Sequence, residues 1–230
     1  MTAQLRPDAV TAQTFDLTNP ATGELVGSYP VHSAEDVAGA VAAARAAQVW
    51  WVELGYAGRK QRLMRWVSWL AKNSDEICEL GFRETGKPKG DVQFELMAGL
   101  DDIRWAARNA ERVLKRRRVR PGAAMMNFEA SVEYLPLGVA GVIAPWNFPF
   151  YTPLCGMAYA LAAGNATVVK PSEFSTATGV YAVESSTRRI RTCRPGWSAG
   201  CPASGRPVPR CATPASTRSR SPGPSRPGAR

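Results

Sequence analysis

A long stretch without charge constrains this chain more than any other feature. From Tyr134 to Val169 no residue is charged, and the next residue is Lys170. A run of this length is long enough to cross a bilayer. However, prolines at positions 136, 145, 149 and 153 interrupt it, and each removes a backbone donor that hydrocarbon would leave uncompensated. The stretch therefore predicts a buried core segment interrupted by a loop, and not a membrane span.

Two strand patterns lie inside this stretch. "VAGVIAP" is continuously apolar, as expected of a parallel strand covered on both faces, and "ATVVK" is a second strand. Between them, Thr152 as N-cap, Pro153 in the first turn and Gly164 at the end predict a helix. Thr176 is expected to open another helix. A right-handed crossover makes the two strands parallel and places the loops that follow them at one edge of the sheet.

The region before this stretch has the pattern of a hairpin followed by helices. "FDLTNPATGELVGSYPV" predicts two short strands around a turn. Ser33, with Asp36 three positions later, forms a capping box that opens the first helix. Two further segments repeat apolar residues at helical spacing and predict packing faces. They are Leu63, Trp66, Val67 and Leu70 in the first, and Val92, Leu96, Ile103, Ala107 and Leu114 in the second.

A basic run and a second alternating segment follow these helices. We expect Lys115–Arg118 at a helix C-terminus, where the helix dipole favours cations; contact with phosphate is the alternative. After Pro121, "SVEYLPLG" alternates like a strand. The architecture therefore changes from helical to α/β at this point.

The net charge of +10 comes from one end of the chain. Residues 185–230 contain ten Arg and no Lys, Asp or Glu, which leaves 19 of the 29 Lys and Arg residues to face all 19 Asp and Glu. This tail also holds eight of the 18 Pro and few large apolar residues, so it would bury too little surface to offset the entropy of ordering. We therefore expect a disordered tail and a neutral body.

The N-terminal residues and the cysteine spacing bear on the cellular compartment. The N-terminus lacks the basic start and apolar run of a signal peptide, and no two of the five cysteines form a C-x-x-C pair. We expect a reduced, cytoplasmic setting, and these residues give no reason to expect a metal site.

The loops after the two predicted strands gather polar side chains at one rim. In open α/β sheets ligands bind outside the carboxyl ends of strands, which places Trp146, Asn147, Lys170, Ser172 and Glu173 where a nucleotide or substrate would lie. The Asn147 amide is a neutral donor suited to an oxyanion; a turn residue is the alternative. Lys170 and Glu173 suit the hydroxyls of a sugar, because an ammonium donates and a carboxylate accepts; a solvated strand end is the alternative.

The longer motifs resemble a known family. "GVIAPWNFPF" followed by "ALAAGNATVVKPSE" is similar to the NAD(P)-dependent aldehyde dehydrogenase superfamily, and "NPATGE", "ETGKP" and "EYLPLGVAGVIAPWNFP" match earlier landmarks of that family in order. These motifs are long and therefore specific. The resemblance extends from Phe15 to Val183.

The resemblance implies a fold and its parts. We expect an incomplete α/β fold with an N-terminal helical region and part of a Rossmann-like parallel sheet. The parts are an N-terminal arm over 1–14, a hairpin with helices and an oligomerisation-type strand over 15–138, a partial dinucleotide-binding domain over 139–185, and a disordered tail over 186–230.

The resemblance also implies roles for the rim residues. Asn147 matches the asparagine that helps to hold the thiohemiacetal oxyanion. Lys170 and Glu173 match the residues that bind the adenosine ribose of NAD or NADP, with Ser172 in the same cofactor-binding loop. The loop that lines the cofactor groove matches Ile143, Ala144, Pro145 and Trp146. In that family a downstream Cys attacks the aldehyde, hydride passes to the nicotinamide, and a Glu activates the deacylating water.

This sequence departs from the family downstream of the rim. The segments "F-T-G-S", "E-L-G-G" and "G-Q-x-C", which supply the cofactor turn, the glutamate and the nucleophile, are absent from the 230 residues. Cys155 lies early on a predicted helix and is expected to pack as a small apolar residue. We therefore expect an inactive, truncated relative of enzymes that oxidise aldehydes, with weak or no binding of NAD or NADP.

Two functions are alternatives to that of an inactive relative. In the first, the chain is a non-catalytic partner that joins a homo-oligomer or a full-length relative through "SVEYLPLG". In the second, it is a basic protein whose tail binds nucleic acid by counterion release. The tail has little aromatic interleaving, which disfavours nucleic acid.

The composition of the tail also fits a GC-rich coding sequence read out of frame from about Val183–Thr187. With suitable synonymous codons, Arg220–Pro224 re-reads as the missing Phe-Thr-Gly-Ser.

Overall fold

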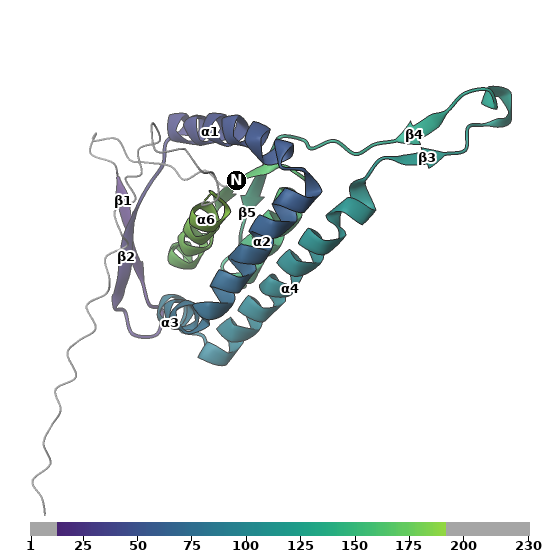
Figure 1. Cartoon of the computed structure of the whole chain (residues 1–230). Helices are drawn as coiled ribbons and strands as arrows, with labels where there is room; N and C mark the ends of the chain where they lie inside the picture. Colours follow the sequence, from purple (N-terminus) through teal and green to yellow (C-terminus); the bar gives the residue numbers. More distant parts are fainter. Residues whose placement is uncertain (1–12, 192–230) are drawn as a thin grey trace, which may run out of the picture. The chain divides into compact units, whose positions relative to one another are not determined.

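The computed structural model describes residues 13–191, all of which lie within one compact unit. Figure 1 labels most of its elements. In chain order they are β1 (Thr14–Thr18), β2 (Leu25–Pro30), α1 (Ala34–Glu53), α2 (Gly55–Lys72), α3 (Ser74–Thr85), α4 (Lys89–Leu114), β3 (Arg117–Val119), a 3-10 turn (Ala123–Met125), β4 (Ala130–Val132), β5 (Val139–Ile143), α5 (Tyr151–Ala162), β6 (Ala166–Lys170) and α6 (Thr176–Arg191). Most of the predicted N-terminal arm, and the tail from residue 192, lie outside the described residues.

The predicted hairpin and the first capping box are confirmed. Strands β1 and β2 pair antiparallel, and the Asn19 side chain closes their turn by accepting from the backbone N–H of Ala21 at 2.8 Å. At the start of α1, the Ser33 hydroxyl accepts from the Asp36 N–H at 3.1 Å, and the Asp36 carboxylate accepts from the Ser33 N–H at 2.8 Å. Both features arise from residues within a few positions of one another, which is why the sequence reveals them.

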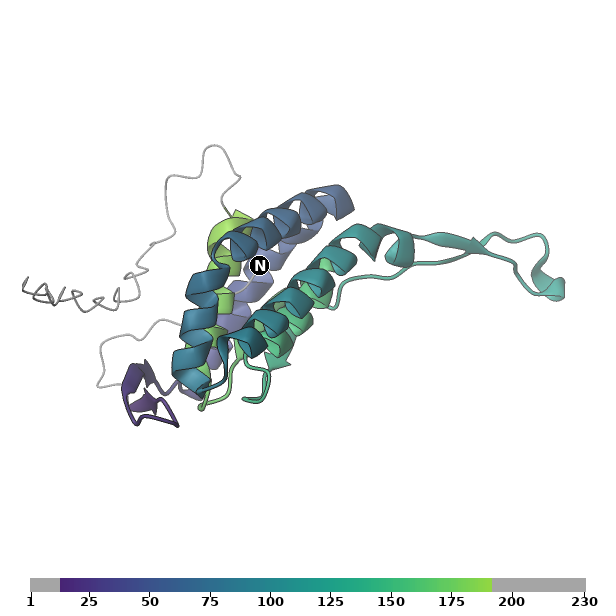
Figure 2. The ribbon, with the colours of Figure 1, turned by 90° about the horizontal axis from the view of Figure 1, so that it is seen from below.

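The core forms where the helices pack against one another. The predicted apolar residues of α2 are buried, and so are those of α4 except Leu114, which is half-buried. All of these except Val92 and Leu114 join a single cluster with Trp51 of α1, Phe150, Leu154 and Met157 in and before α5, and Ile190 of α6. Figures 1 and 2 show α2 and α4 side by side along much of their length. Each fully buried large side chain contributes roughly 1.5–3 kcal/mol, so this cluster fixes how the helices meet.

The sequence analysis expected all of Lys115–Arg118 at the C-terminus of a helix, and this is wrong for the last two residues of the run. Helix α4 stops at Leu114, and Arg117 and Arg118 belong to β3, which pairs antiparallel with β4. Strand β4 ends at Val132, so most of "SVEYLPLG" is not strand. Cross-strand pairing with residues 130–132 outweighs the poor intrinsic strand preference of this run. The two strands form a ribbon that extends away from the helices (Figure 1).

Strands β5 and β6 form the predicted parallel pair, with Val139 opposite Ala166 and Ile143 opposite Lys170. Helix α5 connects them, and Gly164 ends the connection with a φ of +97°, as its sequence position predicts. Helix α5 begins at Tyr151 after Phe150, so Thr152 is not its N-cap. The N-terminus of α5 is capped instead by the side chain of Glu95 in α4.

The C-terminal end of α5 is also held by distant side chains. The Trp51 indole N–H donates to the carbonyl of Leu161 at 2.8 Å, and the Arg59 Nε donates to the carbonyl of Ala162 at 3.2 Å. Both side chains are buried. The N-terminal helices therefore donate to two carbonyls in the last turn of α5, one of which, Leu161, also accepts from the Gly164 N–H.

Helix α6 extends beyond the predicted boundary at residue 185. It continues to Arg191, and Ile190 is fully buried in the core cluster. Apolar contact with that cluster therefore orders residues that composition assigned to the tail. Among the helices of the described part of the chain, none combines the length and the apolar character needed to cross a bilayer.

Candidate functional site

The parallel register brings the two predicted site loops together. Ile143 and Lys170 lie opposite each other at the carboxyl ends of β5 and β6, and the Ala144 N–H donates to the Lys170 carbonyl at 3.0 Å. The "PWNFP" loop therefore leaves β5 beside the point where "KPSE" leaves β6. This is the edge at which ligands bind in open α/β sheets.

The first loop presents an apolar surface. Ile143 is 79% exposed and Trp146 is 60% exposed, and Pro145 is exposed as well. Ala144 is buried, because its backbone continues the sheet. Exposed large apolar side chains that gather at a sheet edge mark a binding surface more often than scattered ones do. Ile143, Pro145 and Trp146 thus offer a surface for a planar ring, and Ala144 supports them from below.

Asn147 lies at the exposed tip of this loop. Its backbone carbonyl accepts a short hydrogen bond from the Lys87 ammonium. The same ammonium lies 4.9 Å from the centre of the Phe148 ring, within cation–π range. The backbone of Asn147 is thus fixed while its side-chain amide is left exposed.

The second loop carries Lys170 and Glu173 with both side chains more than 60% exposed. Their charged atoms are 3.9 Å apart, and the Lys170 ammonium also donates to the Pro171 carbonyl at 3.3 Å. An exposed pair at this separation contributes little to stability. Both groups are therefore available to hydroxyls of a ligand.

Ser172 differs from the two residues that flank it. It is 8% exposed, and its hydroxyl accepts from the Phe174 N–H at 3.2 Å. Its carbonyl accepts from the Thr176 hydroxyl at 2.9 Å. Ser172 therefore shapes the turn between Lys170 and Glu173, and the sequence pattern did not distinguish it from the exposed members of the loop.

Sequence reasoning missed a buried carboxylate beneath the first loop. Glu95 of α4 is 2% exposed, and its Oε1 lies 2.8 Å from the Lys87 ammonium. Its Oε2 accepts from the backbone N–H groups of Phe150 at 3.2 Å and Tyr151 at 3.4 Å. This carboxylate is the cap of α5, where a negative charge also meets the positive end of the helix dipole. One signal was present: Glu95 lies on the apolar stripe of α4 beside Leu96.

A second buried carboxylate lies beneath the other loop. Glu84, at the end of α3, is 1% exposed and accepts from the N–H groups of Ala177 at 2.5 Å and Thr178 at 3.0 Å. Burial raises the pKa of Glu84 to about 7, and the hydrogen bonds from Thr178 and Ala177 oppose that rise. Glu84 follows Ile77 and Gly81 at helical spacing, so it too occupies a position on a buried stripe.

Cys155 does not have the properties of a nucleophile. Burial raises the pKa of its thiol, and a hydrogen bond with Asp102 raises it further. A neutral thiol is a poor nucleophile. Cys155 is half-buried, and its hydrogen bond with Asp102 differs from the purely apolar packing expected from the sequence. Within residues 13–191, no three His, Cys, Asp or Glu side chains are arranged to hold a metal ion.

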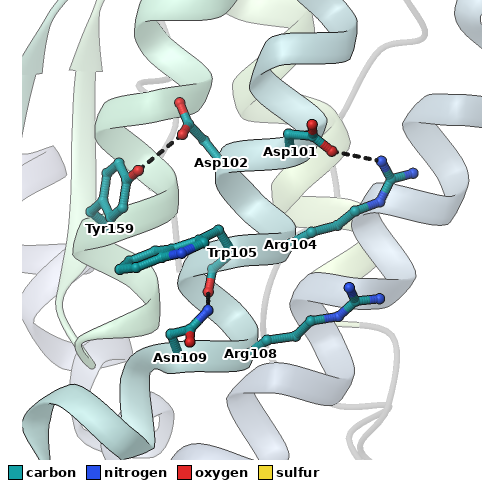
Figure 3. A pocket seen from close by; sticks show the side chains of 7 residues that line it. All are labelled: Asp101, Asp102, Arg104, Trp105, Arg108, Asn109 and Tyr159. Carbon is teal, nitrogen blue, oxygen red and sulfur yellow. Dashed lines mark hydrogen bonds and ion pairs between the residues drawn. The ribbon is translucent and has the colours of Figure 1, made fainter.

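An open hollow of about 510 Å³ lies further along α4 and α5 (Figure 3). In it, the Tyr159 hydroxyl donates to Asp102 at 2.9 Å, and the Trp105 and Tyr159 rings meet edge to face with their centres 6.1 Å apart. Tyr159 is eight residues beyond Tyr151, about 12 Å along the helix. None of the residues that line the hollow belongs to either loop.

Taken together, the rim offers three kinds of contact. The apolar surface can hold a planar ring, the exposed ammonium and carboxylate can bind sugar hydroxyls, and the Asn147 amide can donate to a carbonyl oxygen or an oxyanion. The set suits a nucleotide cofactor beside a carbonyl substrate.

Comparisons with known proteins relate this chain to a family. A family model described as "Aldehyde dehydrogenase family" matches residues 8–188. A protein of Mycolicibacterium smegmatis named "Putative succinate-semialdehyde dehydrogenase", with NADP(+) in its name, is 39% identical over 153 residues. That match covers 65% of this chain and 29% of the relative.

Solved structures resemble the described fold over a similar part. A succinate-semialdehyde dehydrogenase from Burkholderia pseudomallei is 32% identical, with a TM-score of 0.73, over 77% of this chain and 36% of that one. An NADP-dependent glyceraldehyde-3-phosphate dehydrogenase from Bacillus halodurans, solved with NADP, is 31% identical, with a TM-score of 0.72, over 78% and 38% of the two chains. This chain thus spans well under half the length of these relatives.

Proposed function

Because the chain belongs to the aldehyde dehydrogenase family, we propose that its rim supplies two parts of an NAD(P)-dependent oxidation of an aldehyde. Lys170 and Glu173 bind the adenosine ribose, and the Asn147 amide donates to the oxyanion that forms when a thiolate adds to the aldehyde. Bound NAD or NADP would supply the hydride acceptor. The observation that carries the proposal is the register that sets Ile143 opposite Lys170.

The remaining rim residues have supporting roles in this proposal. Ile143, Pro145 and Trp146 form the exposed apolar wall of the cofactor groove, and Ala144 fixes that wall to the sheet through its hydrogen bond to Lys170. Ser172 sets the turn that holds Lys170 and Glu173 on the same side of the loop. Exclusion of water by the apolar wall would strengthen each polar contact beside it.

We further propose that this chain by itself does not oxidise aldehydes. Burial raises the pKa of both Cys78 and Cys155, and the family's nucleophile and deacylating glutamate segments are absent from the sequence. The two cysteines are free thiols, which fits the reduced, cytoplasmic setting expected from the sequence. Positioning and oxyanion stabilisation without a nucleophile leave the first bond-forming step without a reactant.

Cofactor binding tests the first proposal. We expect NAD or NADP to bind with a Kd on the order of 1 mM, because the ribose contacts are present and a phosphate-binding turn is not. Lys170→Ala and Glu173→Ala should each weaken binding severalfold in a titration followed by ligand-observed NMR. Lys60→Ala, an exposed lysine on α2, is the matched control. Micromolar affinity, or equal affinity in the Lys170→Ala and Lys60→Ala variants, would contradict the proposal.

A turnover assay tests the second proposal. The aldehydes to use are those in the names of relatives: succinate semialdehyde, glyceraldehyde 3-phosphate and benzaldehyde. We expect no reduced cofactor to accumulate with any of them. Turnover that disappears in a Cys155→Ala variant would show that this thiol is reactive despite its burial.

A specific observation favours a further role for the β3–β4 ribbon. The ribbon and the segment after it expose large apolar side chains, with Met126 at 79%, Phe128 at 61%, Leu135 at 75% and Leu137 at 92%. We propose that this surface joins a second copy of the chain or a full-length relative. Light scattering after gel filtration should show a dimer or larger species that Leu135→Asp with Leu137→Asp returns to a monomer. A monomeric unmodified chain at high concentration would count against self-association.

We also propose that a shift of reading frame near Val183–Thr187 produced the Arg-rich segment. The absence of Lys, Asp and Glu from residues 185–230 supports this. With suitable synonymous codons, Arg220–Pro224 would also re-read as Phe-Thr-Gly-Ser. The codons of the gene decide it, because only particular synonymous codons spell that turn in the shifted frame. Other codons there would end the proposal.

A further inference from the structure

One short segment contacts the first site loop and the start of the helix that follows the second site loop. It consists of Glu84 and Thr85, the last residues of α3, and of Gly86 and Lys87, which lead to α4. Glu84 accepts from backbone N–H groups in the first turn of α6, and Lys87 donates to the Asn147 carbonyl. Residues only three positions apart therefore hold the loop after β5 and the helix that follows the loop after β6.

The segment is itself tightly turned. Gly86 has a φ of +70°, in the left-handed region that favours glycine, and its N–H donates to the Phe82 carbonyl at 2.9 Å. The Thr85 hydroxyl donates to the Gly81 carbonyl at 2.7 Å and accepts from the Lys87 N–H at 3.2 Å. These bonds fix the direction in which the Lys87 side chain leaves the turn.

Glu95 completes the arrangement around Asn147. It accepts from the Lys87 ammonium with one oxygen and from the Phe150 and Tyr151 N–H groups with the other. The exposed loop is thus held at its tip, Asn147, through Lys87 and after its tip through Glu95. Charge-assisted hydrogen bonds of this kind are shorter and stronger than neutral ones.

We infer that Lys87 and Glu95 are positioning residues, which set the direction of the Asn147 amide through the backbone of its loop. This inference rests on the proposed role of Asn147 as an oxyanion donor. Glu95 is buried, and Lys87 is 28% exposed and contacts the rim at the Asn147 carbonyl and the Phe148 ring. Oxyanion donors act only within a narrow range of distance and angle, and a displacement of about 1 Å can cost roughly a hundredfold in rate. An anchor beneath the loop is therefore as necessary as the amide.

The unmodified chain offers the first test. The Lys87 ammonium protons should exchange slowly enough with water to give a distinct ¹⁵N–¹H signal, because they are hydrogen-bonded to Glu95 and Asn147. Lys89 is the matched comparison, since it lies two residues away, is 58% exposed and pairs with Glu79 on the surface. If the Lys87 ammonium exchanges as fast as that of Lys89, the inference is wrong. This measurement needs no substitution and so does not depend on a variant folding.

A pair of variants offers the second test. Lys87→Met should shift the side-chain amide signal of Asn147. It should also speed hydrogen exchange at the Thr152 N–H by about tenfold or more, because this N–H is bonded to the Phe148 carbonyl of the loosened loop. Exchange at the Ala177 N–H should not change. Lys89→Met removes the same charge and should leave both readouts as in the unmodified chain. An Asn147 signal that is equally unchanged in both variants would overturn the inference.

Binding of ADP-ribose separates this inference from the proposed function. Lys87→Met should leave the Kd for ADP-ribose within about twofold, because the ribose contacts at Lys170 and Glu173 lie on the other loop and the apolar wall is tied to the sheet through Ala144. If ADP-ribose fails to bind even the unmodified chain, the proposed function fails. The ammonium exchange and the Asn147 signal still decide whether Lys87 and Glu95 hold the loop.

Discussion

The N-termini of α5 and α6 are alike in geometry and different in charge balance. Each is capped by a buried glutamate that is far away in sequence, Glu95 for α5 and Glu84 for α6. The Glu95 carboxylate also faces the Lys87 ammonium at 2.8 Å. The groups that hydrogen-bond Glu84 are the neutral backbone and hydroxyl of Thr178 and the backbone of Ala177.

The difference shows how a buried carboxylate depends on its partner. A cation within hydrogen-bond distance compensates the loss of water around Glu95, at the cost of desolvating the cation. Around Glu84, helix N–H dipoles do not compensate fully, and burial raises its pKa to about 7. The loop with the ion pair is the one that carries Asn147. Under the proposed function, the direction of the Asn147 amide demands more rigidity than the exposed contacts of Lys170 and Glu173 do.

Removal of Glu95 should have the largest effect. Glu95→Ala leaves Lys87 partly buried without its partner and two N–H groups of α5 without an acceptor, so we expect a loss of about 3–5 kcal/mol in the free energy of unfolding. Urea denaturation measures this, and Glu111→Ala, an exposed glutamate near the end of the same helix, is the control. A loss below about 1 kcal/mol would mean that Glu95 does not anchor α5.

The pH dependence of stability should reveal Glu84. The raised pKa means that the folded chain keeps this proton while the unfolded chain loses it between about pH 4.5 and pH 7. The contribution of Glu84 to the free energy of unfolding should therefore be greatest below pH 4.5, fall as pH rises, and become constant above pH 7. The shift corresponds to about 3 kcal/mol.

Glu84→Gln isolates this contribution. The amide keeps the size of the side chain and one of the two acceptor oxygens that face the α6 N–H groups, but it has no proton to lose. Urea denaturation at several pH values should then show a flatter profile, whereas Glu111→Gln should keep the original slope. An unchanged slope in the Glu84→Gln variant would refute the assignment of the pH dependence to this residue.

Two glycines sharpen the comparison at a smaller scale. A Cβ on Gly156 of α5 would lie 2.8 Å from a methyl of Val142, whereas one on Gly179 of α6 would overlap the rigid ring of Pro171. Val142 can change rotamer and Pro171 has little freedom, so we expect Gly179→Ala to cost about 2–3 kcal/mol and Gly156→Ala about 1 kcal/mol. Melting temperatures of the two variants compare these costs directly. The reverse order would show that α5 is the more tightly packed helix.

The sequence predicted what depends on near neighbours. The Ser33–Asp36 capping box, the apolar stripes of α2 and α4, the strand patterns of β5 and β6 and the turn at Gly164 all involve residues within a few positions of each other. The parallel order of β5 and β6 also followed, because the helix between them leaves few other connections. This was enough to predict that the Asn147 and Lys170 loops share an edge.

The tertiary structure alone decided how those loops are held. Glu95 lies 55 positions before the α5 N–H that it caps, and Glu84 lies 93 positions before its partner in α6. The sequence pattern also did not reveal the start of α5, the pairing of Arg117 and Arg118 with β4, or the burial of Ser172 and Ile190. A glutamate on an apolar stripe indicates a buried charge, but its partner is set by the way whole helices pack. That packing depends on the shape of the entire core, which no local pattern encodes.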